Sequence, residues 1–255
     1  MNARRIIPCL DVIDGRVVVG EQFKHIKDVA DPMTLAKTYE ADGADDLIIY
    51  NISAMPQGKT DFLQMIEAIS QVITMPLTVG GGLQTLHDIE QVLLSGADRV
   101  SINSSAIHQP RFLQEATSAF GSERVVCAID AKQIGPKTWH AFTNGGKKDS
   151  GRNVFTWAQQ TEALGVSEII LNCIDADGVK EGYNIELNRQ MTEAVHIPVI
   201  ASGGAGQLEH FATVFTETNV SGALAASVFH YGDLNIHDVK QFLHLQNIAV
   251  KGLTT

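Results

Sequence analysis

The chain has 255 residues, a hydrophobic content of 44% and a formal net charge of -10. This length allows a large core, and the sequence contains no run of about 18 apolar residues that could span a membrane. The negative charge gives no long-range attraction for nucleic acid, so a bound phosphate has to be held by local geometry. The N-terminal residues lack the pattern of a secretory signal, and we therefore expect the protein in the cytoplasm.

Short apolar runs alternate with amphipathic segments along the chain. Most of these runs are continuously apolar, as in parallel strands that are buried on both faces. The helix predicted over residues 32–41 starts after Asp31, an N-cap residue, with Pro32 at its first position. A second helix is predicted over residues 86–94. The predicted strands cover residues 6–10, 47–52, 77–79, 100–103, 125–129, 169–174, 199–201 and 223–226.

Eight such strand and helix units predict an α/β protein, a single (β/α)8 TIM barrel domain over residues 1–255. An open, doubly wound sheet is the alternative. Several segments of the first half also recur in the second half, so we expect the barrel to consist of two similar half-barrels. The matching pairs are residues 6–11 and 125–130, 43–47 and 165–169, 76–82 and 198–204, and 95–102 and 221–228.

Two of these repeats predict phosphate sites. "TVGGG" and "IASGG" each place glycines directly after an apolar run, at residues 80–82 and 203–204. Active sites of (β/α)8 barrels lie at the C-terminal ends of the strands, where such loops let backbone N–H groups approach an anion. An isolated Gly-Gly pair could simply turn the chain. Its repetition at matching positions favours two phosphates, one in each half.

Asp11 and Asp130 follow the first and fifth apolar runs at matching positions. In a twofold barrel they lie on opposite sides of the mouth, between the two phosphate sites. Two carboxylates in different surroundings can take different protonation states, so that one donates and the other accepts a proton. Capping of a neighbouring loop is the alternative for each, but their symmetry favours an acid/base pair.

Other motifs predict neither a metal nor a cofactor. Cys9, Cys127 and Cys173 lie inside apolar runs without CxxC spacing, which is typical of core residues in a reducing compartment. None of the nine histidines belongs to a HExxH pattern. The segment 142–152 is expected to form a hairpin over the mouth, or alternatively a solvated cluster of charges.

Several motifs together resemble one known family over essentially the whole chain. They are "RIIPCLDVIDGRVV", "TVGGG", "SINSSA", "AIDAK", "DGVKEGY", "IASGGAG" and "AASVFHYG". These motifs resemble the cyclase subunit of imidazole glycerol phosphate synthase, a lyase of histidine biosynthesis. The resemblance implies a bis-phosphorylated ribulosyl-formimino-carboxamide nucleotide as substrate. Ammonia attacks its ketone, and cleavage with ring closure gives imidazole glycerol phosphate and an aminoimidazole carboxamide ribonucleotide.

The resemblance also implies roles for individual residues. Asp11 and Asp130 correspond to the acid/base pair. Asp177, in the loop after the sixth strand, would contact the substrate. Asn103 and Asp177 are also ordinary loop residues. The phosphate sites would be lined by Gly82 and Asn103 in the first half, and by Gly203, Gly204 and Ser227 in the second.

The ammonia source has to be a partner, because a glutaminase needs an activated cysteine with a histidine base. In the family, a glutamine amidotransferase docks on the N-terminal face of the barrel and passes ammonia through the centre. By resemblance, four charged residues at strand starts would gate this passage. Ordinary ion pairs at strand starts are the alternative. The four residues are Arg5, Asp46, Arg99 and Glu168.

Two positions depart from the family pattern. Val19 stands where a lysine is usual, and Asn51 stands where an aspartate is usual. Both changes remove a charge near the mouth, so catalytic rate is less well predicted than fold. The alternatives are a related phosphoribosyl isomerase, a sugar-amidation barrel subunit, or a weakened scaffold that binds and stimulates the glutaminase. Asp11 argues against the sugar-amidation subunit, which lacks the first aspartate.

Overall fold

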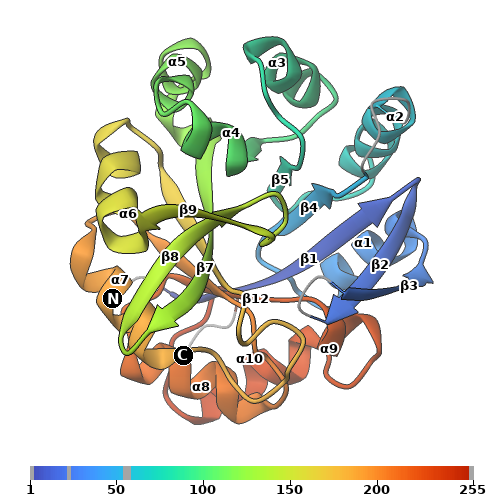
Figure 1. Cartoon of the computed structure of the whole chain (residues 1–255). Helices are drawn as coiled ribbons and strands as arrows, with labels where there is room; N and C mark the ends of the chain where they lie inside the picture. Colours follow the sequence, from blue (N-terminus) through green and yellow to red (C-terminus); the bar gives the residue numbers. More distant parts are fainter. Residues whose placement is uncertain (1–2, 22–23, 54–58, 253–255) are drawn as a thin grey trace.

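The computed structural model describes residues 3–21, 24–53 and 59–252, and the side chains of residues 20, 21, 24–28 and 59 are not considered. Its centre is a closed barrel of parallel strands (Figure 1). Each barrel strand pairs with the next, and the pairs β6–β7 and β12–β1 join the two halves into a closed barrel. The (β/α)8 TIM barrel is confirmed, and an open sheet is excluded. The barrel strands are β1 (Arg5–Ile13), β4 (Leu47–Asn51), β5 (Leu77–Gly80), β6 (Arg99–Ile102), β7 (Val125–Gly135), β10 (Glu168–Cys173), β11 (Val199–Ser202) and β12 (Gly222–Ala225).

Helices surround the barrel, as Figure 1 shows. The side chain of Asp31 accepts a hydrogen bond from Thr34 N, so the predicted N-cap of α1 is confirmed. Among the described residues, no helix is long and apolar enough to cross a membrane. The helical elements are α1 (Pro32–Ala41), α2 (Lys59–Ser70), α3 (Leu86–Leu94), α4 (Ser104–His108), α5 (Arg111–Phe120), the 3-10 turn η2 (Ser122–Arg124), α6 (Val154–Ala163), α7 (Ile185–Ala194), α8 (Leu208–Glu217), α9 (Ser227–His230) and α10 (Ile236–Leu245).

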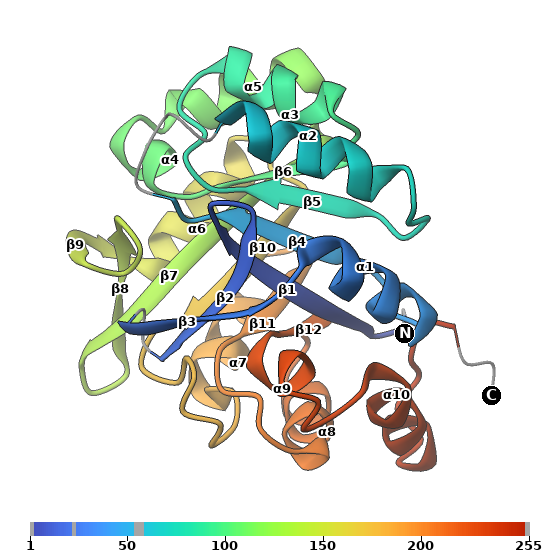
Figure 2. The same cartoon turned by 90° about the vertical axis from the view of Figure 1, so that its right-hand side faces the viewer.

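The first and fifth barrel strands are longer than predicted, because each continues into an antiparallel extension. β1 pairs with β2 (Arg16–Glu21), which pairs with β3 (Lys24–Ala30). β7 pairs with β8 (Thr138–Thr143), which forms a hairpin with β9 (Lys148–Asn153). The hairpin expected over residues 142–152 is thus present. Both extensions project from the same end of the barrel, the left in Figure 2.

The core has two parts. The larger part fills the space between the strands and the surrounding helices. The smaller part lies inside the barrel and contains Ile7, Cys9, Ile48, Val126, Ala128, Ile170, Ile200 and Leu224. All three cysteines are free and buried in strands, as expected from their sequence context.

The pairing registers show which residues correspond between the two halves. Cys9 pairs with Ile48, and Ala128 pairs with Ile170, in agreement with the sequence match of the first two strands. The sequence match of residues 95–102 with 221–228 is wrong by three positions, because Thr78 pairs with Arg99 while Ile200 pairs with Gly222. The shared "SGA" letters caused this error, because they lie before β6 in the first half but run into β12 in the second. In the structure, Asn103 therefore corresponds to Ala226.

Candidate active site

Three carboxylates face one another at the mouth of the barrel. Asp11 lies on β1 and Asp130 on β7, four strands apart around the barrel, and Asp177 lies in the loop after β10. All three are partly exposed to solvent. Desolvation by the barrel wall, followed by the charges of Asp177 and Asp130, raises the pKa of Asp11 to about 7. Desolvation and the charge of Asp130 likewise raise the pKa of Asp177 to about 7.

Asp130 is held by two side-chain amides. Asn103 Nδ2 donates to Asp130 Oδ2 at 2.8 Å, and Asn172 Nδ2 donates to Asp130 Oδ1 at 3.2 Å. Ser202 Oγ donates to Asn172 Oδ1 at 3.1 Å and so orients that amide. Desolvation raises the pKa of Asp130, but both amides oppose the rise because they stabilise the charged form.

The surroundings of Asp11 are different. Within the described part of the chain, no side chain donates a hydrogen bond to its carboxylate. The registers place Tyr50 where the second half has Asn172, and the Tyr50 hydroxyl binds Ser101 Oγ at 3.1 Å. Asp11 therefore keeps its proton more readily than Asp130 does near neutral pH.

Asn172 and Ser202 were not identified from the sequence. The only signal was a polar side chain inside each otherwise apolar run, "IILNCI" and "VIAS". Because Asn172 and Ser202 lie on other strands than Asp130, sequence spacing could not show that Asn172 reaches Asp130 or that Ser202 reaches Asn172. The barrel brings them together by pairing Asn172 with both Asp130 and Ser202.

The two glycine loops lie at the same end of the barrel, after β5 and β11, which are four strands apart. Gly82 has a φ of +69°, and a Cβ there would meet open space. Gly204 has a φ of +108°, and a Cβ there would lie 2.0 Å from Gly182 O. Gly182 N also donates to Gly204 O at 2.7 Å. The first loop is thus open, whereas the second is packed against the segment that follows Asp177.

The remaining predicted phosphate residues are placed as follows. Gly203 has a φ of +89°, and a Cβ there would lie 2.7 Å from Cys173 O. Ser227 is the first residue of α9 and follows β12, next to the Gly203 loop on β11. Asn103 precedes α4, but its amide is turned to Asp130, which makes it a neighbour of the carboxylates.

The two departures from the family pattern also lie near the mouth. Val19 is on β2, and its backbone pairs with Lys27 of β3. Asn51 ends β4, and its Oδ1 accepts a hydrogen bond from Ser53 N at 3.0 Å. The side chains of Lys24 and Lys27, which could supply the missing cation, lie outside the described residues. The Asn51 side chain thus forms a hydrogen bond within its own loop.

At the opposite end of the barrel, four charged side chains form a closed ring. Arg5 binds Asp46 at 2.8 Å and also pairs with Glu168. Arg99 binds Asp46 and Glu168, each at 3.1 Å. The carboxylates are buried, and the two arginine side chains are 18% exposed. The structure thus brings together all four residues predicted from the sequence, at the N-terminal ends of β1, β6 and β10 and just before β4.

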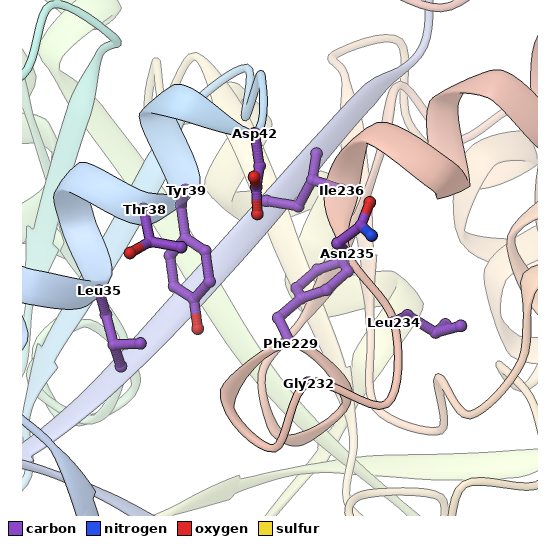
Figure 3. Close-up of a pocket in the computed structure, with 9 residues that line it drawn as sticks. All are labelled: Leu35, Thr38, Tyr39, Asp42, Phe229, Gly232, Leu234, Asn235 and Ile236. Carbon is purple, nitrogen blue, oxygen red and sulfur yellow. The ribbon is translucent and has the colours of Figure 1, made fainter.

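A separate cavity of about 160 Å³ lies between α1 and the segment from α9 to α10 (Figure 3). Leu35, Tyr39, Phe229 and Ile236 are among its lining residues. None of the predicted site residues contributes to it, so this cavity on the helical layer is not the reaction site. Within the described ranges, no group of three or more His, Cys, Asp or Glu residues is placed to hold a metal ion.

Comparisons with known proteins agree with this arrangement. The family model described as "Histidine biosynthesis protein" matches residues 5–235. An imidazole glycerol phosphate synthase subunit HisF from Oceanobacillus iheyensis is 49% identical over 251 residues, which cover 98% of each chain. HisF subunits from two Clostridium botulinum strains, Okra and Langeland, are each 44% identical over 98% of this chain and 100% of their own. The chain therefore belongs to the histidine biosynthesis protein family and, within it, to the HisF subunits of imidazole glycerol phosphate synthase.

Proposed function

We propose that this chain uses ammonia to cleave and cyclise the bis-phosphorylated ribulosyl-formimino-aminoimidazole carboxamide nucleotide. The products are imidazole glycerol phosphate and aminoimidazole carboxamide ribonucleotide. The observation that carries this proposal is the unequal pair of aspartates at the mouth, supported by 44–49% identity to HisF subunits along nearly the whole chain. The location in the cytoplasm stays a prediction.

Asp11 acts as the proton donor and Asp130 as the proton acceptor. The two amides on Asp130 stabilise its carboxylate form, in which this group can take a proton from the attacking ammonia. Asp11 lacks such donors among the described side chains, and its pKa of about 7 leaves a large protonated fraction at neutral pH. It can therefore protonate the leaving or developing oxygen or nitrogen atom of the substrate. Asp177 contacts the substrate beside them.

The two phosphate groups bind at opposite sides of the mouth. The first lies at Gly82 and the backbone at Asn103, after β5 and β6. The second lies at Gly203, Gly204 and Ser227, after β11 and β12. Backbone N–H groups in these loops can approach an anion because glycine leaves no side chain in the way. The acid/base pair then lies between the two phosphates.

A glutaminase partner supplies the ammonia at the other end of the barrel. Val72, Leu94 and Leu245, which lie after α2 and at the ends of α3 and α10, are exposed. Helices of a (β/α)8 barrel run opposite to the strands, so these apolar side chains lie at the same end as the ring of ion pairs. Exposed apolar side chains around a polar centre fit a docking surface for a protein. Ammonia would enter through the ring.

A reaction without the partner tests the proposed function. The purified chain is incubated with the bis-phosphorylated nucleotide and excess ammonium chloride, and both products are separated and quantified. We expect both products in equal amounts, and at least about a hundredfold less in an Asp130→Asn control. Isomerised nucleotide without cleavage would instead support the related isomerase. No conversion of any kind would support a scaffold that only binds the glutaminase.

A further inference from the structure

The cavity between α1 and the segment from α9 to α10 lies in the helical layer, outside the barrel (Figure 3). Its inner lining is buried, since Tyr39, Phe229 and Ile236 are at most 6% exposed. Its rim is open to solvent, because the lining residues Thr38 and Asn235 are exposed. A small molecule can therefore enter from the surface and leave water at the inner end.

Two aromatic rings form part of the inner lining. The ring centroids of Tyr39 and Phe229 lie 6.3 Å apart, with an angle of 59° between the ring planes. The Tyr39 hydroxyl is already engaged, because it forms a hydrogen bond with His230 Nδ1 at 2.5 Å. Both side chains therefore present aromatic carbon to a ligand. Aromatic rings bind apolar groups and attract organic cations.

One polar group of the lining is left without a partner. Thr38 Oγ1 donates to Thr34 O at 3.0 Å, and Asn235 Oδ1 accepts from Asp238 N at 2.8 Å. Within the described part of the chain, the carboxylate of Asp42 forms no hydrogen bond or ion pair. The cavity thus combines an aromatic and aliphatic lining with a single free negative charge.

The position of Asp42 makes a cation at this place favourable. Asp42 is the C-cap residue of α1, and the last turn of this helix has no basic residue. A negative charge at the C-terminal end of a helix is unfavourable, because the carbonyl groups there carry partial negative charge. Figure 3 shows the Asp42 side chain reaching from the end of α1 towards Ile236. A cation bound beside it would interact with both the carboxylate and the helix end.

We propose that this cavity is a binding site for a small organic cation with one ring, whose ring packs on Tyr39 and Phe229 and whose ammonium group pairs with Asp42. The volume of about 160 Å³ suits this size, since an apolar cavity of about 150 Å³ holds one benzene molecule. A more polar molecule would lose hydration at the inner lining without gaining hydrogen bonds. The site is separate from the mouth, and the inference does not rest on the proposed function.

A titration with two ligands of equal shape tests the site. Benzylamine, which is protonated at pH 7, and the neutral benzyl alcohol are each added to the full chain, and two-dimensional NMR spectra are recorded. We expect saturable shifts with benzylamine and a dissociation constant about fivefold higher for benzyl alcohol, the scale of one ion pair or cation–π contact. Shifts that do not saturate with benzylamine, or equal affinity for both ligands, would overturn the proposal.

Asp42→Asn keeps the side-chain shape and removes the charge. Its melting temperature should not fall, because the carboxylate has no partner to lose. Benzylamine should bind this variant about fivefold more weakly than the parent, and benzyl alcohol equally well. Asp61→Asn is the matched control, since Asp61 is exposed on α2 and does not line the cavity. An equal loss of benzylamine affinity in both variants would indicate attraction by net charge alone and would refute the site.

Hydrogen exchange locates the bound ligand. Benzylamine should slow exchange of backbone amides in α1 and in residues 228–239, which contribute the lining, and leave the strands of the barrel unchanged. Leu35→Trp places a larger side chain in the cavity and should abolish binding of both ligands. Protection confined to other parts of the chain would overturn the assignment. If Leu35→Trp does not fold, Asp42→Asn and the exchange pattern still decide it.

Discussion

The two halves of the barrel place an aspartate at the same position but surround it differently. Asp130 accepts hydrogen bonds from Asn103 and Asn172. At the corresponding positions around Asp11 lie Ala226, which follows β12, and Tyr50 of β4, neither of which carries a side-chain amide. The two aspartates thus occupy equivalent backbone positions but have different side chains around them, and their proton affinities differ for this reason. A symmetric fold provides an asymmetric acid/base pair in this way.

The same contrast occurs at the opposite end of the barrel. Arg99 of the first half corresponds by register to Gly222, and Arg5 corresponds to Arg124. Arg5 and Arg99 belong to the ring of ion pairs, whereas Arg124 is exposed. Three of the four ring residues therefore come from the first half. The ring is a feature of the assembled barrel and not of each half.

The largest expected effect concerns the aspartate pair. Asp11→Asn and Asp130→Asn keep the side-chain shape and remove its capacity to transfer a proton. We expect ammonium-driven turnover to fall by at least about a hundredfold in each variant. The measurement is the initial rate of product formation at saturating nucleotide, with circular dichroism to establish folding. Unchanged turnover in either variant would remove that aspartate from the reaction.

A smaller effect concerns stability against pH and sharpens the contrast between the halves. The pKa of Asp11 is raised to about 7 in the folded state, so between pH 4 and 7 the folded state binds more protons than the unfolded state. Stability from this group is therefore present at low pH and is lost as pH rises towards 7. Relative to the parent, the free energy of unfolding of Asp11→Asn should increase by about 2 kcal/mol between pH 5 and pH 8.

Urea unfolding of the parent and both variants at the two pH values measures this gain. Asp130→Asn should gain less, because the amides of Asn103 and Asn172 oppose the rise in the pKa of Asp130. Equal gains in the two variants would show that the neighbours do not distinguish the carboxylates. The comparison uses differences between variants at each pH, so the titration of distant groups cancels.

The smallest expected effect compares Arg99 with Arg124. If the ring gates ammonia, Arg99→Ala should lower the ratio of glutamine-driven to ammonium-driven turnover about tenfold, which corresponds to roughly 1.4 kcal/mol. Loss of stability is expected under either interpretation, because the carboxylates of Asp46 and Glu168 lose a partner. Arg124→Ala is the control and should leave the ratio unchanged. A parent-like ratio in Arg99→Ala would leave the ring as a structural set of ion pairs.

Much of the fold followed from local patterns. All eight barrel strands were predicted within a few residues, because strands buried on both faces are continuously apolar. The ends of β1 and β7 were missed, since their extensions depend on antiparallel pairing with β2 and β8 that apolar runs do not reveal. The register of the last strand was also missed, because similar letters in the sequence do not determine which backbone groups pair.

Local patterns also identified the chemistry that belongs to single residues. An aspartate at the end of an apolar run, or a glycine pair after one, can be recognised from the sequence. Its chemical group or backbone conformation depends on the residue type itself and not on distant parts of the chain. The different roles of Asp11 and Asp130 depend instead on Asn172 and Tyr50, which lie more than 35 residues away in the sequence. Only the pairing of neighbouring strands brings these side chains to the carboxylates, and proton affinity is a property of neighbours in space. The sequence alone therefore determined the barrel and its candidate residues, whereas the tertiary structure decided which carboxylate holds its proton.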